Sequence, residues 1–358
     1  HLNGAHFSRR YLETVFAATF EINSYNSPTI EIHINCSCLS TGNIMNLNRR
    51  EVLATTGAMA LGGLTTSNIL AGESKLDKKA KVRYCLNTST IREKKLPIEE
   101  IVDIAAETGY EGIEPWISEL QTYQKSGKSL PDLKKKLADH GMKVESAIGF
   151  ARWIVDNEEE RAAGLEQMKR DMDLVKSVGG THIAAPPVGM HGGNSTNLDL
   201  FAAAERYHAV LEVGRETGVI PQVEIWGPSK NLSRLGEAIF VAVESGHSDA
   251  CVLPDVYHIF RGGSAFAGLG LLSGDAVHCF HFNDYPAEPA RLEMNDSHRV
   301  YPGDGVAPWK EIIGILNSIG FNGAASLELF NKDYWKQDPK TVMETGLRKM
   351  KAVFEENS

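Results

Sequence analysis

A regular alternation of short apolar runs and longer amphipathic stretches constrains this fold most. Eight runs rich in apolar and β-branched residues recur from residue 82 onward, and a helical pattern follows each one. The repeat is about 35 residues long, which is typical of a strand–helix unit. The expected strands are 82–87, 111–116, 143–148, 181–186, 221–226, 250–255, 277–283 and 323–329. Eight such units predict an α/β fold, a single (β/α)8 TIM barrel over residues 81–358.

The segments that follow these strands have helical periodicity, and several of them end in glycine. A glycine just after the last turn is a common helix stop, because it adopts the left-handed conformation without a steric penalty. The helices are expected at 98–108, 160–178, 198–217, 232–245, 309–319 and 340–354, and the glycines are Gly109, Gly141, Gly179, Gly218, Gly246 and Gly320. An open, doubly wound sheet is the alternative. It calls for a glycine-rich phosphate loop after the first strand, where this chain has 87–90, Asn-Thr-Ser-Thr.

Charge and cysteine content exclude several classes of protein. The net charge is −9, with no basic stripe, which argues against binding nucleic acid through its phosphates. Five cysteines in 358 residues do not make a disulfide scaffold, and no Cys-x-x-Cys pair indicates a zinc or redox motif. We expect an ordinary globular protein that does not bind nucleic acid.

The first 80 residues are not expected to belong to the barrel. Two arginines, Arg49 and Arg50, precede a short apolar run from Val52 to Leu64 that is too short to cross a bilayer. This layout resembles a twin-arginine export signal over 45–72, with no cysteine for a lipid anchor. Residues 1–44 then read as an upstream extension and 73–80 as a linker. The protein is expected to be exported to the periplasm without a stable membrane anchor. If 45–72 is instead a short helix packed on the domain, the protein is cytoplasmic.

Four residues with metal-ligating side chains lie at or near the ends of the last four expected strands. They are Glu224, Asp255, His281 and Glu328, one per repeat. Barrel enzymes build their sites where the carboxyl ends of the strands converge. Carboxylates between apolar neighbours are costly to bury unless a positive group meets them. Three acids and one imidazole suit a single divalent ion, either Mn²⁺, Mg²⁺, Co²⁺ or Zn²⁺.

At these residues the chain resembles the xylose isomerase-like barrel superfamily, especially its sugar isomerase and epimerase group. The family's Asp-x-x-His appears at Asp255 and His258, and its Arg-x-x-Pro-Gly-x-Gly runs from Arg299 to Gly305. The resemblance covers roughly 82–354. It implies that the four residues named above bind one metal ion and that His258 and Arg299 hold oxygens of a small sugar substrate. Barrels of this family often form homo-oligomers.

The resemblance implies proton abstraction next to a carbonyl, giving an enediolate that a divalent metal stabilises. Glu224 and Glu328 then serve as the catalytic pair, one removing the proton and the other returning it. The ketose epimerases of the family carry another glutamate six residues after the first of these ligands, where this chain has Lys230. We expect an isomerase or epimerase. The alternative is a lyase of the inosose dehydratase type on the same site.

Further substrate contacts are expected around the barrel mouth. Trp116 and Trp226 lie at strand ends, where an indole can stack on a sugar ring or pack in the core. Glu114 can line the pocket or hydrogen-bond its rim. His191 lies in a glycine-containing loop after the fourth expected strand, which is either a lid over the site or a plain turn.

Two other functions compete with the enzyme hypothesis. A DNA repair endonuclease of the same superfamily uses extra histidines on early strands and an Asp-x-His motif, where this chain has Ser297 and Arg299. A non-catalytic carbohydrate-binding barrel is expected to lack a metal ligand, and all four ligand-type residues are present here. Both alternatives are therefore less favoured.

Overall fold

The computed structural model describes residues 20–22, 32–34 and 80–357, which fall into two compact units, His1–Ser74 and Lys75–Ser358. In the first unit, strand β1 (Phe20–Ile22) pairs antiparallel with β2 (Ile32–Ile34). This pair lies within 1–44, where the sequence predicts no fold. The export signal predicted over 45–72 lies outside the described residues, as does the linker 73–80 except for Ala80.

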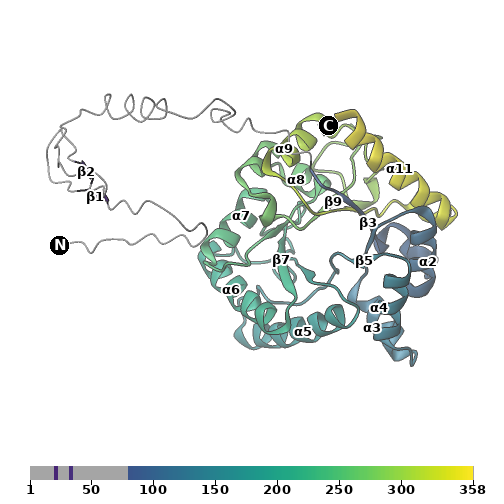
Figure 1. Ribbon diagram of the computed structural model, residues 1–358, viewed down its shortest axis with the longest axis horizontal. Coiled ribbons are helices and arrows are strands. Elements are labelled where there is room, and N and C mark those ends of the chain that lie inside the picture. The colour runs from purple at the N-terminus through teal and green to yellow at the C-terminus, as the bar shows by residue number, and fades with distance from the viewer. Residues whose placement is uncertain (1–19, 23–31, 35–79, 358) are drawn as a thin grey trace. The chain divides into compact units, whose positions relative to one another are not determined.

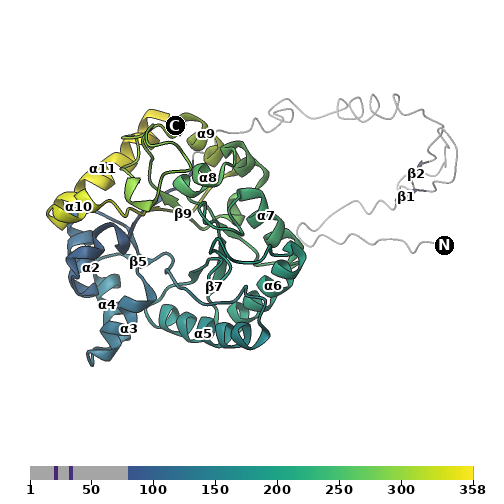
Figure 2. The same ribbon diagram turned by 180° about the vertical axis from the view of Figure 1, so that it is seen from behind.

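The second unit is a barrel of parallel strands ringed by helices (Figure 1, Figure 2). β10 pairs with β3, which joins the last strand to the first. Two pairs of neighbouring strands are joined by fewer contacts than the others. Ala184 N donates to Ala147 O at 2.8 Å between the third and fourth strands, and a parallel bridge joins Asp255 to His281 between the sixth and seventh. The strands are β3 (Arg83–Asn87), β4 (Gly112–Glu114), β5 (Lys143–Val144), β6 (His182–Ala185), β7 (Ile220–Glu224), β8 (Val252–Leu253), β9 (Cys279–Phe282) and β10 (Ala324–Leu327).

The predicted TIM barrel is confirmed, and each predicted strand overlaps one of these eight. The glycines predicted to end helices all have positive φ, for example 94° at Gly109 and 80° at Gly218. The helices are α2 (Ile98–Thr108), α3 (Ile117–Lys125), α4 (Leu130–Asp139), α5 (Glu158–Ser177), α6 (Leu200–Thr217), α7 (Leu235–Glu244), α8 (Val256–Gly262), α9 (Trp309–Ile319), α10 (Lys332–Lys336) and α11 (Pro339–Asn357). Short 3-10 turns are η1 (Thr88–Lys94), η2 (Phe266–Leu271), η3 (Gly274–Ala276) and η4 (Asp296–His298). Among the described residues, no helix has the length and apolar character needed to cross a membrane.

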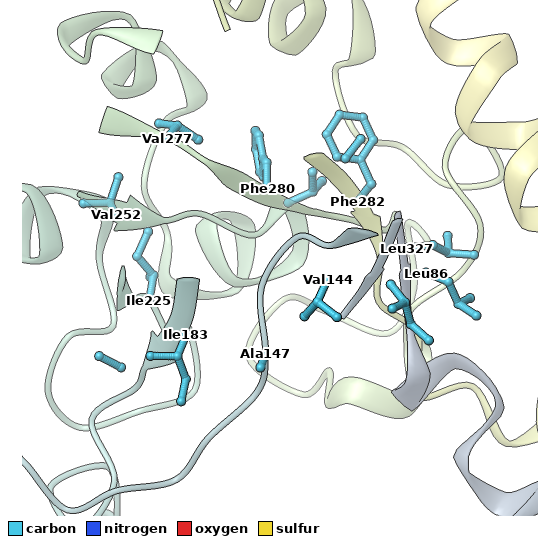
Figure 3. Packing of buried hydrophobic residues seen from close by; sticks show 14 of the residues in the cluster. Leu86, Val144, Ala147, Ile183, Ile225, Val252, Val277, Phe280, Phe282 and Leu327 are labelled. Carbon is cyan, nitrogen blue, oxygen red and sulfur yellow. The ribbon is translucent and has the colours of Figure 1, made fainter. Parts of the chain in front are cut away.

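Side chains that alternate along each strand point either to the apolar core or to the barrel interior. On β9, Phe280 and Phe282 belong to the main apolar core (Figure 3), and Phe282 stacks on Phe354 of α11 at 5.3 Å between ring centroids. The intervening residues Cys279 and His281 point to the opposite face, because successive strand side chains alternate. Cys279 packs in a small inner cluster with residues of other strands, and His281 lies one step nearer the carboxyl end. The barrel interior is therefore apolar at one level and polar at the next.

Candidate active site

His281 is the centre of a fully buried cluster of ionisable side chains. Its Nδ1 lies 3.2 Å from Glu328 Oε2 and 3.6 Å from Asp255 Oδ2. One ligand atom from each of these three residues lies within 4.8 Å of the other two, a spacing that could hold a metal ion. Burial alone lowers the pKa of His281, but Glu328 and Glu114 raise it well above the usual value for histidine. The arrangement concentrates negative charge around one imidazole.

Asp255 is fixed at this centre by the start of a helix. It caps α8, and its Oδ1 accepts a hydrogen bond from His258 N at 2.7 Å. Its Oδ2 accepts from Asn283 Nδ2 and from Arg299 Nη1, each at 2.9 Å. Burial acts to raise the pKa of Asp255, yet the Arg299 guanidinium holds it well below the usual range. The carboxylate is therefore ionised and rigidly placed.

Glu224 and Glu328 reach the same region from strands on different parts of the barrel. Glu224 is the last residue of β7, and Glu328 directly follows β10. Glu328 accepts from Asn87 Nδ2 at 3.2 Å and from Arg299 Nη1 at 2.7 Å. Glu224 differs, because its buried Oε2 has no hydrogen-bond partner among the described residues. Burial raises the pKa of Glu224, and the negative charge of Glu328 raises it further.

Arg299 ties the cluster to the adjacent loop. Besides Asp255 and Glu328, its guanidinium donates to Asp296 Oδ1 at 2.7 Å and lies 3.0 Å from His258 Nε2. Because Nε2 faces this cation, it serves as the acceptor, and the proton of a neutral His258 lies on Nδ1. That Nδ1 is buried and has no partner among the described residues. Among the described residues, the Nδ1–H donor of His258 is therefore left without an acceptor.

Glu114 is placed differently from the sequence prediction of a pocket-lining residue. It is 0% exposed and lies behind His281, with Oε2 3.1 Å from His281 Nε2. The same oxygen accepts from Ser326 Oγ at 2.7 Å and Asn87 Nδ2 at 3.0 Å. A substrate in the cavity cannot reach it. The sequence places Glu114 on the right strand but does not show that its neighbours enclose it.

A cavity of about 320 Å³ opens over the cluster. Trp116, Trp226 and His191, predicted as substrate contacts, line it together with Glu224, Glu328, His258 and Arg299. Asp255 and His281 lie beneath its floor and are fully buried. Phe150 and Phe330, which the sequence analysis did not single out, complete an aromatic rim. Phe150 lies 5.0 Å from Trp116 and 6.3 Å from Trp226 between ring centroids. An apolar rim above charged groups is typical of small-ligand sites.

The loop that carries His191 is held at the cavity by the next loop. Lys230 N donates to His191 O at 2.9 Å, and the His191 ring meets Trp226 edge-on at 5.3 Å. Asn231 Nδ2 donates to Met190 O at 2.8 Å. His191 therefore lines the cavity from a loop that the neighbouring loop holds by hydrogen bonds.

The Arg-x-x-Pro-Gly-x-Gly segment owes its glycines to Asp284. Asp284 follows β9, and its Oδ2 accepts from Gly303 N at 2.9 Å and Trp309 Nε1 at 2.8 Å. A side chain at Gly305 would place its Cβ 2.3 Å from Asp284 Oδ1 and 2.2 Å from Tyr285 O. Glycine is therefore required there, and the tight loop presents Arg299 to the cluster.

Besides Phe150 and Phe330, three polar contributors were missed from the sequence. Asn87 and Asn283 orient Glu328 and Asp255, and Asp296 lines the cavity beside Arg299. Asn87 and Asn283 both end or directly follow a predicted strand, the same position that identified the acids. Asp296 lies three residues before Arg299 in the polar loop. No sequence spacing identified it as a site residue.

The fold and the site together define the class. A parallel barrel with an imidazole and several carboxylates at the carboxyl ends of its strands, below a cavity with an aromatic rim, is the architecture of a TIM-barrel enzyme. The chain belongs to the xylose isomerase-like TIM barrel family, whose model matches residues 102–353.

Named relatives agree with this class. The inosose isomerase of Bacillus velezensis is 22% identical over 274 residues, covering 76% of this chain and 97% of the relative. The D-psicose 3-epimerase of Agrobacterium fabrum is 22% identical over 241 residues, covering 64% and 78%. A solved structure of the IOLI protein with a bound zinc atom has a TM-score of 0.72 at 20% identity, covering 77% of this chain and 99% of that one. These relatives are isomerases and epimerases by name, and the solved structure shares the fold.

Proposed function

We propose that this protein is a metal-dependent isomerase or epimerase of a small unphosphorylated sugar or keto-sugar. The observation that carries the proposal is the pair Glu224 and Glu328, which line one cavity from strands β7 and β10. Moving a carbonyl, or inverting the carbon beside it, requires a proton to leave and a proton to return. Two carboxylates on one cavity can divide these tasks. The named isomerase and epimerase relatives support the same reaction class.

The residues of the cluster fit a divalent metal ion. His281 Nδ1 is buried without a hydrogen-bond partner among the described residues, and so is Glu224 Oε2. Asp255 and Glu328 would complete the donor set, a mixture of oxygen and nitrogen that suits Mn²⁺, Mg²⁺, Co²⁺ or Zn²⁺. When bound, such an ion supplies positive charge that stabilises the enediolate.

Side chains of the protein carry out proton transfer and substrate binding. Glu224 and Glu328 both line the cavity, so one of them is placed to take the proton and the other to return it. His258 donates from Nδ1 to a substrate oxygen, and Arg299 supports it through Nε2. Trp116, Trp226 and Phe150 cover the apolar face of the sugar and exclude water.

One observation keeps a lyase as the second candidate. Lys230 is exposed at the position where family ketose epimerases carry a further glutamate, so that carboxylate is missing from this site. His258 Nδ1–H is instead available as an acid. A carboxylate would remove the proton beside the carbonyl, and His258 would protonate the departing hydroxyl on the next carbon. The product would be lighter by one water.

Incubation with a panel of ketoses, inososes and keto-sugars in deuterated water separates these reactions by NMR. Deuterium on the carbon next to the carbonyl, in a product with no water lost, supports the isomerase. A dehydrated product establishes the lyase, and absence of exchange with every sugar contradicts both. Glu224→Gln and Glu328→Gln should each slow exchange by about 100-fold or more. Glu244→Gln, an exposed acid on α7, is the matched control and should keep full activity.

A further inference from the structure

Asp296 is a carboxylate of the cavity that stands apart from the buried cluster. It lines the cavity, and its side chain is 46% exposed, whereas Asp255 and His281 are fully buried. Its Oδ1 accepts a hydrogen bond from Arg299 Nη2 at 2.7 Å. Its Oδ2 is not buried and accepts no hydrogen bond from the described residues. One oxygen of Asp296 is therefore available to a ligand in this cavity.

The turn that carries Asp296 fixes its position before a ligand arrives. Asn295 Oδ1 accepts from Ser297 N at 3.0 Å and from Ser297 Oγ at 2.6 Å, which closes the short helix η4 around Asp296. Burial acts to raise the pKa of Asp296, but the Arg299 guanidinium holds it below the usual value. Asp296 is thus an ionised acceptor in a set place.

Arg299 sets how far Asp296 lies from the buried cluster. One terminal nitrogen of the guanidinium, Nη1, donates to Asp255 and Glu328, and the other, Nη2, donates to Asp296. Asp296 is therefore one guanidinium group away from two of the predicted metal ligands. A sugar whose carbonyl lies over the cluster would meet Asp296 with a hydroxyl about two or three carbon atoms further along. A hydroxyl that donates to a carboxylate makes a charge-assisted hydrogen bond, which is stronger than one to a neutral acceptor.

The charges around this cavity oppose an anionic substituent. Among the described residues, Arg299 is the only lysine or arginine that lines it. Asp255, Glu328 and Asp296 share its positive charge, and its Nη2 also lies 3.0 Å from His258 Nε2. Phosphate and carboxylate groups are commonly bound by the N–H groups of an arginine in a bidentate manner. Each terminal nitrogen of Arg299 already has two partners, so neither has a hydrogen left for such a group.

We propose that Asp296 determines substrate specificity: its available oxygen binds a hydroxyl of a neutral sugar or cyclitol, and its negative charge excludes a phosphate or carboxylate at that end of the substrate. The inference rests on the proposed function, because it assumes that a sugar carbonyl lies over the buried cluster. Asp296 contacts the substrate away from the carbon whose proton is removed. Its loss therefore changes substrate binding and selectivity, and it leaves proton transfer by Glu224 and Glu328 in place.

The test compares D-fructose, D-psicose and myo-inositol with their monophosphate esters. Calorimetry gives the affinities, and deuterium exchange gives kcat and KM for the sugars that react. Asp296→Asn keeps an oxygen for Arg299 and removes the charge, and Asp132→Asn, exposed on α4, is the matched control.

We expect the wild-type protein to bind at least one neutral compound about tenfold or more tightly than its ester, because the ester brings a second negative charge close to Asp296. Asp296→Asn should bind that neutral compound about five- to tenfold more weakly, with kcat nearly unchanged, because it loses a charge-assisted hydrogen bond. It should also reduce the preference over the ester by about tenfold or more. Asp132→Asn should behave as the wild type.

Three results would overturn this role: none of the three neutral compounds binds, every ester binds the wild type as tightly as its parent, or Asp296→Asn keeps the full preference. If Asp296→Asn fails to fold by circular dichroism, Asp296→Ser makes the same comparison. Deuterium exchange on a sugar, with the selectivity unchanged in Asp296→Asn, removes only the role of Asp296. Altered selectivity without exchange on any sugar removes the enzymatic function and leaves a binding role for Asp296.

Discussion

The Glu114 carboxylate favours a proton on one particular nitrogen of His281. Its Oε2 lies 3.1 Å from His281 Nε2, and this negative charge favours a proton on that nitrogen. Nδ1, 3.2 Å from Glu328 Oε2, is then the nitrogen that would bind a metal ion held by Asp255 and Glu328. Partners behind a ligating histidine commonly set both its tautomer and its affinity for metal. We therefore propose that Glu114 is a positioning residue, which acts through His281 and does not touch substrate.

Glu114→Gln should weaken metal binding by about 10–100-fold while the fold is retained. Glutamine has nearly the same shape, but it removes the charge that holds the proton on His281 Nε2. Competition with a chelator measures the affinity, and ¹⁵N NMR of the imidazole reports its tautomer. Glu107→Gln, exposed on α2, is the control. An unchanged affinity together with an unchanged tautomer would refute the positioning role.

Helix α5 carries a buried acid unrelated to the site. Asp171 is 2% exposed, and its one hydrogen bond to another side chain is a long contact of 3.4 Å from Gln167 Nε2. Burial raises the pKa of Asp171 to about 6, above the ordinary value of an unfolded aspartate. The folded state thus holds this proton more tightly than the unfolded state. Its contribution to stability is present below about pH 4 and is lost as the pH rises to about 6.

Asp171→Asn should stabilise the protein at pH 8 by about 1–2 kcal/mol and change little at pH 4. The variant is uncharged at both values, so it avoids the cost of ionising a buried carboxyl. Urea denaturation of both proteins across this range gives the difference, in which the titration of all other groups cancels. A stability difference independent of pH would show that the carboxyl of Asp171 is not perturbed.

At the scale of the whole molecule, the repeat length and the apolar periodicity were sufficient to predict the barrel. The predicted strand ends were accurate enough to show which acids converge, because the carboxyl ends of all strands lie on the same face of a barrel. The role of Glu114 was beyond that reasoning, since its contact with His281 depends on side chains from three other strands.

Export remains a prediction from the sequence, and it concerns the chain as a whole. We propose that Arg49 and Arg50, with the apolar run that follows, direct the folded barrel to the periplasm, and that the mature protein begins near Gly72 to Lys75. The twin-arginine route carries folded proteins, so the barrel would be exported intact.

Replacing both arginines by lysine keeps the charge and removes the paired guanidinium groups. Fractionation should then find the protein in the cytoplasm with its N-terminal segment uncleaved. A Lys78→Arg variant, outside the proposed signal, is the control and should be exported normally. Periplasmic, processed protein from the double lysine variant would contradict the twin-arginine interpretation.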